Sequence, residues 1–142
     1  MKTLTCFIVS TIAFTCYSKD ITAKIIYSEA SNMVSEYERL CVASVIKNRI
    51  NNKSFAKGKL KTMSDVVKQR GAFSSYMEKN SNFYYNGNSK AMYQAKLLAT
   101  GKFKPVIDAH FFHDRSLKHP PAEWGRVKLV KETKYFKFYK QI

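Results

Sequence analysis

Residues 37–50 read YERLCVASVIKNRI, and this stretch decides the fold class. Its apolar and small residues recur at spacings of three and four, which is the period of an α-helix buried along one stripe. The pattern predicts a helix that ends near residues 51–52 and has polar side chains at both edges of its buried stripe. The members of the stripe are Tyr37, Leu40, Cys41, Ser44, Val45 and Asn48.

Three further helices are predicted around this one. Isoleucines on one side of residues 21–30 indicate a short first helix. Thr62, followed by Asp65 three positions later, is typical of a capping box and predicts a second short helix. Ser89 has the side chain of a helix cap and predicts another helix, which stops at Gly101.

The pattern changes after Pro105. Residues 107–113 are rich in β-branched and aromatic side chains, which favour a strand. Residues 127–130 and 135–139 are predicted to pair as a hairpin. The expected fold class is therefore α+β, with helices in the N-terminal half and a short antiparallel sheet in the C-terminal half.

The composition describes one folded and strongly basic domain. The chain of 142 residues has 25 Lys and Arg against 10 Asp and Glu, a formal net charge of +15. Its hydrophobic content of 45% is enough for a packed core and excludes a disordered basic tail. The charge predicts a polyanionic partner, and nucleic acid, an anionic membrane surface or an acidic cell-wall polymer would each satisfy it.

The first eighteen residues predict export. Lys2 is followed by a mostly apolar run, residues 4–17, which has the length of a signal peptide rather than of a membrane span. We expect residues 1–18 to be a signal peptide and residues 19–142 to form the mature domain, secreted or periplasmic. A lipid anchor on Cys16 and an uncleaved membrane anchor are the alternatives. Cleavage removes one lysine and no acidic residue, so 124 residues with a net charge of +14 remain.

Glu29 is the acidic residue whose surroundings point to chemistry, because it lies near the end of an otherwise apolar helix. A carboxyl that is partly removed from water has a raised pKa, which suits a general acid near neutral pH. The alternative is an ordinary solvated carboxylate at a helix end. The local sequence alone leaves both readings open.

A series of short motifs, in this order and spacing, resembles the SleB-type cell wall hydrolase family. The resemblance covers residues 20–142, which is nearly the whole mature chain. The motifs are Tyr27-Ser28-Glu29-Ala30, residues 42–50 (VASVIKNRI), residues 69–74 (QRGAFS), Phe111-Phe112-His113, residues 121–124 (PAEW) and Phe138-Tyr139-Lys140.

The resemblance implies a small lysozyme-like domain that acts on peptidoglycan, at the bond between N-acetylmuramic acid and N-acetylglucosamine. It assigns the role of general acid/base to Glu29 and implies no cofactor. Most glycosidases pair two carboxylates, but Asp108, Asp114 and Glu36 qualify only by residue type. A lytic transglycosylase that uses one glutamate is therefore preferred, and hydrolysis by a muramidase is the close competitor.

Aromatic and polar side chains are expected to bind the sugar, although such aromatics are often simply core residues. The substrate-binding candidates are Tyr27, Phe73, Ser74, His113, Trp124 and Tyr139. No metal is expected at His110, His113 and Asp114, because strand alternation would put the two histidines on opposite faces. Asn48 and Arg49 are expected to hold neighbouring loops by hydrogen bonds.

The chain departs from the family pattern beside Glu29. Ser28 replaces a glycine, residues 31–34 read SNMV instead of an Arg-Gly-Glu run, and Ala72 replaces a glutamine. No Gly-Asn pair precedes the closing strand, so residues 131–134 leave the hairpin turn unassigned.

Two other function classes stay open. One is a wall-binding module that has the same fold without catalysis, and the other is a cationic protein that binds nucleic acid or membranes. Nucleic acid is not an expected partner, because the lysines form no dense run and no nucleic-acid motif. We expect a monomer that binds peptidoglycan and anionic cell-wall polymers.

Overall fold

The structure is a computed structural model that describes residues 21–77, 79 and 81–142. The predicted signal peptide, residues 1–18, lies outside the described residues and stays a prediction. Within the described part of the chain, none of the helices has both the length and the apolar character needed to cross a membrane.

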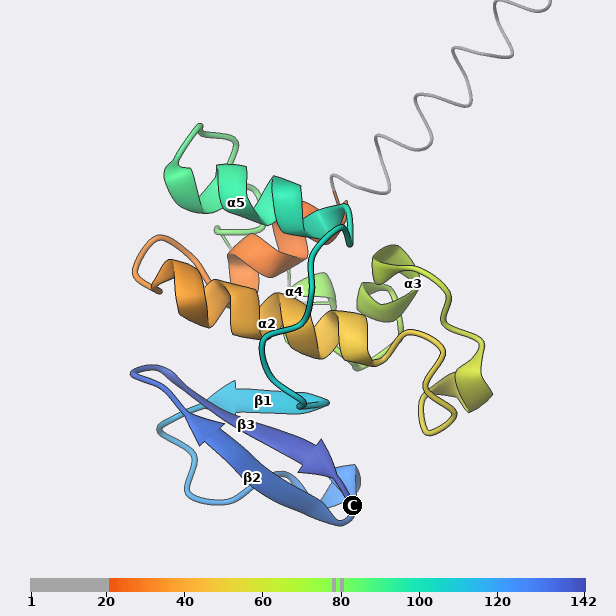
Figure 1. Cartoon of the computed structure of the whole chain (residues 1–142). Coiled ribbons are helices and arrows are strands. Elements are labelled where there is room, and N and C mark those ends of the chain that lie inside the picture. Colours follow the sequence, from red (N-terminus) through yellow and green to blue (C-terminus); the bar gives the residue numbers. More distant parts are fainter. Residues whose placement is uncertain (1–20, 78, 80) are drawn as a thin grey trace, which may run out of the picture.

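Among the described residues, all the α-helices precede the sheet (Figure 1). The helices are residues 21–29, α2 (Glu36–Asn48), α3 (Met63–Val67), α4 (Ser74–Met77) and α5 (Lys90–Ala99), with 3₁₀ helices η1 (Ala56–Gly58) and η2 (Ala122–Trp124). The four predicted helices are confirmed. The short α4 was not predicted, because a helix of one turn is too short to show a period in the sequence.

The predicted helix caps are confirmed. The Thr62 hydroxyl accepts a hydrogen bond from the Asp65 backbone N–H, and the Asp65 carboxylate accepts one from the Thr62 backbone N–H, both at 3.1 Å. Ser89 accepts from the Met92 backbone N–H at 3.1 Å. These bonds satisfy backbone donors that a helix start leaves without partners, so the sequence defines where α3 and α5 begin.

Helix α2 is buried on more than one side. The prediction of a single buried stripe was therefore too narrow. All side chains from Cys41 to Ile46 are enclosed. Ala43 and Ile46 pack in the helical core, whereas Val42 and Val45 pack in a second core together with sheet residues. The cause is position: α2 lies between the other helices and the sheet (Figure 1), so it has two buried faces.

The sheet has three antiparallel strands in the order β1-β3-β2. The strands are β1 (Phe111–Asp114), β2 (Val127–Glu132) and β3 (Phe136–Gln141). The predicted hairpin of β2 and β3 is confirmed. The predicted strand over 107–113 begins only at Phe111, because the Asn48 side-chain amide donates to the Ile107 and Ala109 carbonyls, both at 2.9 Å. These two hydrogen bonds confirm the structural role predicted for Asn48. His110 therefore lies one residue before the strand begins.

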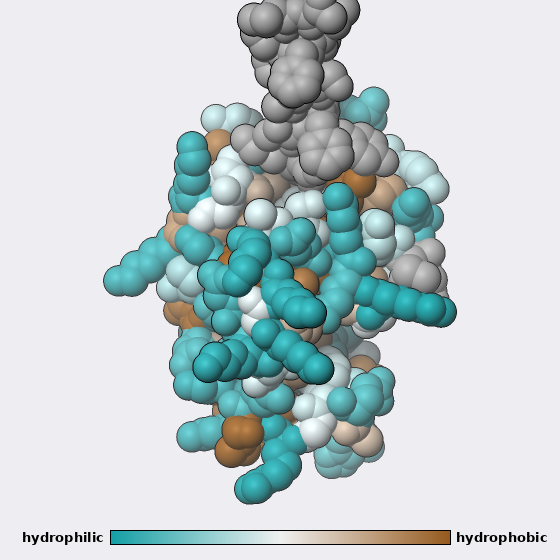
Figure 2. All heavy atoms as spheres, turned by 90° about the vertical axis from the view of Figure 1, so that its right-hand side faces the viewer, coloured by the Kyte–Doolittle hydropathy of each residue, from teal (hydrophilic) through white to brown (hydrophobic). Residues whose placement is uncertain are grey.

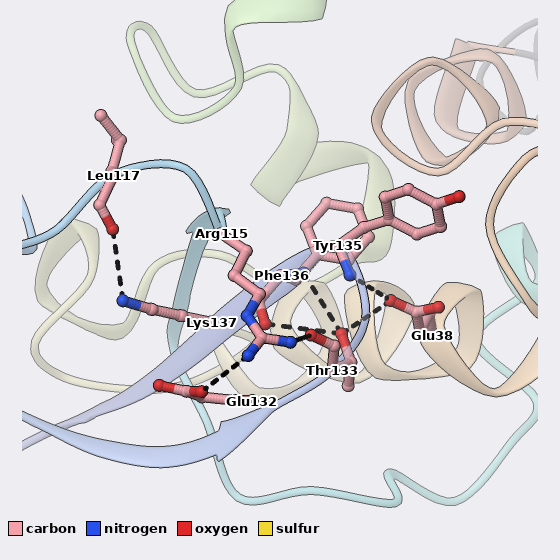
Figure 3. Close-up of polar contacts among 8 residues, drawn as sticks. All are labelled: Glu38, Arg115, Leu117, Glu132, Thr133, Tyr135, Phe136 and Lys137. Carbon is pink, nitrogen blue, oxygen red and sulfur yellow. Dashed lines mark hydrogen bonds and ion pairs between the residues drawn. The ribbon is translucent and has the colours of Figure 1, made fainter.

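A buried carboxylate anchors the hairpin turn that the sequence left unassigned (Figure 3). Glu38 on α2 accepts hydrogen bonds from the Thr133 hydroxyl at 2.7 Å and the Tyr135 backbone N–H at 3.0 Å. Only 5% of Glu38 is exposed. Two bonds from the turn compensate for burying this charge, so Glu38 joins the sheet to the central helix.

Candidate functional site

A cavity of about 370 Å³ lies where the first helix, the segment after α2, the start of α4 and strand β1 meet. Glu29 forms part of its wall at the end of the first helix. Phe73 and Ser74 come from the start of α4, and Trp124 comes from η2. The fold therefore brings together side chains from six separate parts of the chain, strand β3 being the sixth through Phe136.

Five of the seven predicted site residues border this cavity. They are Glu29, Phe73, Ser74, His113 and Trp124.

The other two predicted residues, Tyr27 and Tyr139, do not line the cavity. Tyr27 is buried and stacks on Tyr85 with ring centroids 4.8 Å apart. Two positions along a helix correspond to about 200° of rotation, which turns Tyr27 away from Glu29. The Tyr139 ring is buried, and its hydroxyl lies 3.0 Å from Nε2 of His113.

The Glu29 carboxyl is the least solvated acidic group at the cavity. Its removal from water raises the pKa of this carboxyl above the ordinary value for glutamate. The Ser75 hydroxyl donates a hydrogen bond to Oε1, which favours the charged form and opposes part of that rise. Because burial outweighs the bond, Glu29 retains its proton to a higher pH than an exposed glutamate.

Ser75 was missed by the sequence analysis, which selected its neighbour Ser74. The motif at residues 69–74 ends at Ser74, and Ser75 is the next residue, so the motif pointed to the wrong one of two adjacent serines. Helix α4 distinguishes the two: Ser75 is buried and reaches Glu29, whereas Ser74 is exposed at the cavity.

His113 combines a cavity position with two fixed ring nitrogens. Nδ1 lies 2.7 Å from the Asp114 carbonyl, which can only accept, so Nδ1 carries a proton. In the neutral ring Nε2 then accepts from the Tyr139 hydroxyl. The ring also stacks against Trp124, with centroids 5.8 Å apart. His113 therefore borders the cavity with both ring nitrogens already engaged within the protein, and its binding of sugar stays a prediction.

Asp114 is a second carboxyl on the cavity wall. It accepts a hydrogen bond from the Ser116 backbone N–H at 2.8 Å, which holds the pKa of Asp114 below its usual range. The other two carboxylates considered do not line the cavity: Asp108 pairs with Lys140 on the surface, and Glu36 is exposed in the first turn of α2. The site therefore contains one carboxyl with a raised pKa and one with a lowered pKa.

Arg39 positions the segment that follows Glu29. Its guanidinium donates to the carbonyls of Ala30, Ser31 and Val34 at 2.6–2.7 Å, and to Oε1 of Gln94 at 2.7 Å. Residues 31–34 are those that depart from the family pattern. The buried Arg39 thus holds this altered segment, which follows Glu29 in the sequence, in one conformation.

No group of three or more His, Cys, Asp or Glu residues suited to a metal ion occurs within the part of the chain that the structure describes. His110 precedes β1, so strand alternation does not set its direction relative to His113, and that part of the prediction is wrong. The chemistry that the described site offers is that of carboxyl, hydroxyl, guanidinium and aromatic groups.

Comparison with known proteins identifies one family and two similar structures. A family model described as cell wall hydrolase matches residues 34–139. This segment starts after Glu29, so the glutamate lies outside the matched residues. No curated protein matches the chain.

The similar structures confirm the α+β fold class. The catalytic domain of the Bacillus cereus SleB protein is 23% identical, with a TM-score of 0.63 over 87% of this chain and 89% of that chain. The catalytic domain of the germination-specific lytic transglycosylase SleB from Bacillus anthracis is also 23% identical, with a TM-score of 0.64 over 87% and 93%. At this identity the likeness establishes the fold only.

Proposed function

The chain belongs to the cell wall hydrolase family, and we propose that its cavity cleaves the glycan strands of peptidoglycan with Glu29 as the general acid. The observation that carries this proposal is a desolvated carboxyl on the wall of a cavity that Phe73, His113 and Trp124 also border. Aromatic faces stack on sugar rings, and a protonated carboxyl beside them can reach a glycosidic oxygen.

The raised pKa of Glu29 suits the first step. A glycosidic oxygen leaves poorly unless it is protonated as the bond to the anomeric carbon breaks. Lysozyme meets this need with a glutamic acid that a hydrophobic pocket keeps protonated. Glu29 has the same physical basis for its proton, because burial is the largest cause of its shift.

The second step favours transglycosylation. After Glu29 has given its proton to the leaving oxygen, its carboxylate takes the proton from the 6-hydroxyl of the muramic acid residue. That oxygen attacks the anomeric carbon, the 1,6-anhydro bond forms, and Glu29 is protonated again without consumption of water. The description of the Bacillus anthracis relative as a lytic transglycosylase supports this route.

Hydrolysis is the second candidate, and Asp114 is the observation that favours it. An ionised carboxylate on the same cavity wall can accept a proton from water as the water attacks the anomeric carbon. In that case the enzyme is a muramidase, and the product has a reducing end in place of an anhydro end.

Export and positive charge fit a cell-wall substrate. Figure 2 shows a face over which hydrophilic side chains project widely. Lys53, Lys57, Lys59 and Lys61 are all exposed on the segment that carries η1. Such a surface attracts the carboxylates and phosphates of a cell wall. We propose a protein secreted or periplasmic after loss of residues 1–18, which binds these polymers as a monomer.

Product analysis tests the proposal. Purified peptidoglycan is digested with the mature protein, with Asp114→Asn, and with Asp108→Asn as a control for an exposed aspartate outside the cavity. Anhydro-ended fragments with activity retained in Asp114→Asn support transglycosylation. Reducing ends, lost in Asp114→Asn and kept in Asp108→Asn, support hydrolysis. A protein that binds the wall polymer and releases nothing is a binding module, and the proposed activity is then wrong.

A further inference from the structure

Arg49 is a buried cation on the wall of the same cavity, and the mechanism above gives it no role. Only 6% of the residue is exposed. Its guanidinium lies among three phenylalanine rings, with centroids of Phe55, Phe73 and Phe111 at 4.9, 5.3 and 5.1 Å. Burial lowers the pKa of Arg49 to about 10, so the side chain stays charged at neutral pH.

The hydrogen bonds of Arg49 are incomplete. Nε donates to the His110 carbonyl at 2.8 Å, which confirms the predicted structural contact. Among the residues that the structure describes, neither terminal nitrogen has an acceptor and no carboxylate pairs with the guanidinium. Arg39, another buried arginine, uses all three of its nitrogens in four hydrogen bonds. The fold therefore satisfies one arginine and leaves the other with free donors.

The free donors of Arg49 can be reached from the cavity. Arg49 borders it together with Glu29. Within the described part of the chain, the fully enclosed side-chain atoms without a partner are Ser28 Oγ and Gln141 Oε1, and the terminal nitrogens of Arg49 are not among them. Buried cations are stable when an oxygen ligand completes their hydrogen bonds. A ligand in the cavity can supply that oxygen.

We propose that Arg49 is a substrate-binding residue that receives a carboxylate of the peptidoglycan strand. This inference rests on the proposed function and identifies which group of that substrate the cavity recognises. A guanidinium offers parallel N–H donors that match the two oxygens of a carboxylate, and the aromatic walls keep water from competing. Peptidoglycan has two sources of this group: the lactyl carboxylate of muramic acid residues that have no peptide, and the free carboxylates of the peptide on the others.

Binding of three small sugars tests the inference without cleavage. Trp124 borders the cavity and is the single tryptophan of the chain, so its fluorescence reports occupancy. The probes are N-acetylglucosamine, which has no carboxylate, N-acetylmuramic acid, which has the lactyl carboxylate, and N-acetylmuramyl-L-alanine, which has it on the peptide. We expect wild type to bind at least one of the two acids about tenfold more tightly than the neutral sugar. The preferred acid identifies the source.

Two variants of Arg49 test whether this residue causes the tighter binding of the acidic sugars. Arg49→Gln is expected to bind all three sugars alike, and Arg49→Lys to keep part of the preference, since lysine has the charge without the paired donors. Lys128→Gln removes an exposed cation that lies outside the cavity lining and is expected to behave as wild type. The inference is wrong if wild type binds the three sugars equally, if Arg49→Gln keeps the preference, or if Lys128→Gln loses it to the same degree.

A folding defect, or failure of the proposed function, can be distinguished from failure of this inference. If melting curves show that neither Arg49 variant folds, wild type decides alone: a preference that persists at about 0.5 M salt supports a buried pair, and one that vanishes contradicts it. A protein that prefers the acids but cleaves no peptidoglycan leaves this inference standing and removes the proposed function. A protein that cleaves peptidoglycan but binds the three sugars equally leaves the proposed function standing and removes this inference.

Discussion

The Ser75 hydroxyl donates a hydrogen bond to Oε1 of Glu29 across 46 positions of sequence. This bond joins the short helix α4 to the end of the first helix. The bond orients the carboxyl and stabilises its charged form, while burial stabilises the neutral form. The balance of these two effects sets the pH at which Glu29 gives up its proton.

Ser75→Ala is expected to move the alkaline limb of the activity profile to higher pH. Loss of the hydroxyl bond leaves only the backbone hydrogen bond from residue 75 to oppose burial, so the pKa of Glu29 rises further and the acid stays protonated to a higher pH. Turnover should also fall about tenfold, because the carboxyl is held less firmly. The measurement is kcat against pH on soluble glycan fragments.

Ser74→Ala is the matched control for that experiment. Ser74 is exposed at the cavity, and the hydrogen bond to Glu29 comes from Ser75. The control should change KM while it leaves the limb in place. If the alkaline limb stays at the same pH in Ser75→Ala, or moves equally in both variants, the hydrogen bond from Ser75 does not influence the pKa of Glu29.

Glu29→Gln is expected to become more stable than wild type as the pH rises. The folded pKa of Glu29 lies above the unfolded value, so the folded state holds the extra proton between the two values. Wild type therefore loses stability as the pH rises from about 4.3 through the folded pKa. The neutral glutamine has no such loss. Melting temperatures of both proteins from pH 4 to pH 8 should diverge, and parallel curves would contradict the desolvation of Glu29.

Arg39→Met is expected to lower the free energy of unfolding by about 3 kcal/mol. The substitution leaves the carbonyls of Ala30, Ser31 and Val34 without their buried donor. Urea unfolding measures the loss, and Lys53→Gln, an exposed change, should stay within about 0.5 kcal/mol of wild type. Equal stability of the two variants would mean that Arg39 does not hold this segment.

Thr133→Val is expected to cost about 1 kcal/mol, because it removes a hydrogen bond to the buried Glu38. The comparison is Arg115→Gln at the same turn, which removes an exposed ion pair to Glu132 at 3.7 Å and should cost about 0.5 kcal/mol or less (Figure 3). Urea unfolding of both variants decides the point. A larger cost for Arg115→Gln than for Thr133→Val would refute the anchoring role of Glu38.

The fold was predictable where local chemistry decides it. Capping side chains defined the starts of α3 and α5, and residues 135–139 were predicted as the second strand of the hairpin, which is β3. Contacts between distant segments escaped prediction. The second buried face of α2 depends on a sheet that packs against it, and the late start of β1 depends on the Asn48 amide.

The site was predictable in part for the same reason. The resemblance to the SleB-type cell wall hydrolase family is confirmed, and its motifs selected five residues that meet at the cavity. Tyr27 belongs to a motif, yet helical rotation places it in the core. Whether the guanidinium donors of Arg49 find acceptors depends on which distant segments the fold places beside them. A short sequence motif does not contain that information.

Turnover of purified peptidoglycan by Glu29→Gln tests whether Glu29 is the general acid. Glu132→Gln is the control, since that carboxylate lies on the surface beside Arg115. Glu29→Gln is expected to fold and to lose activity by about 10² to 10⁴, while Glu132→Gln stays near wild type. A folded Glu29→Gln protein that cleaves at the wild-type rate would contradict that role of Glu29.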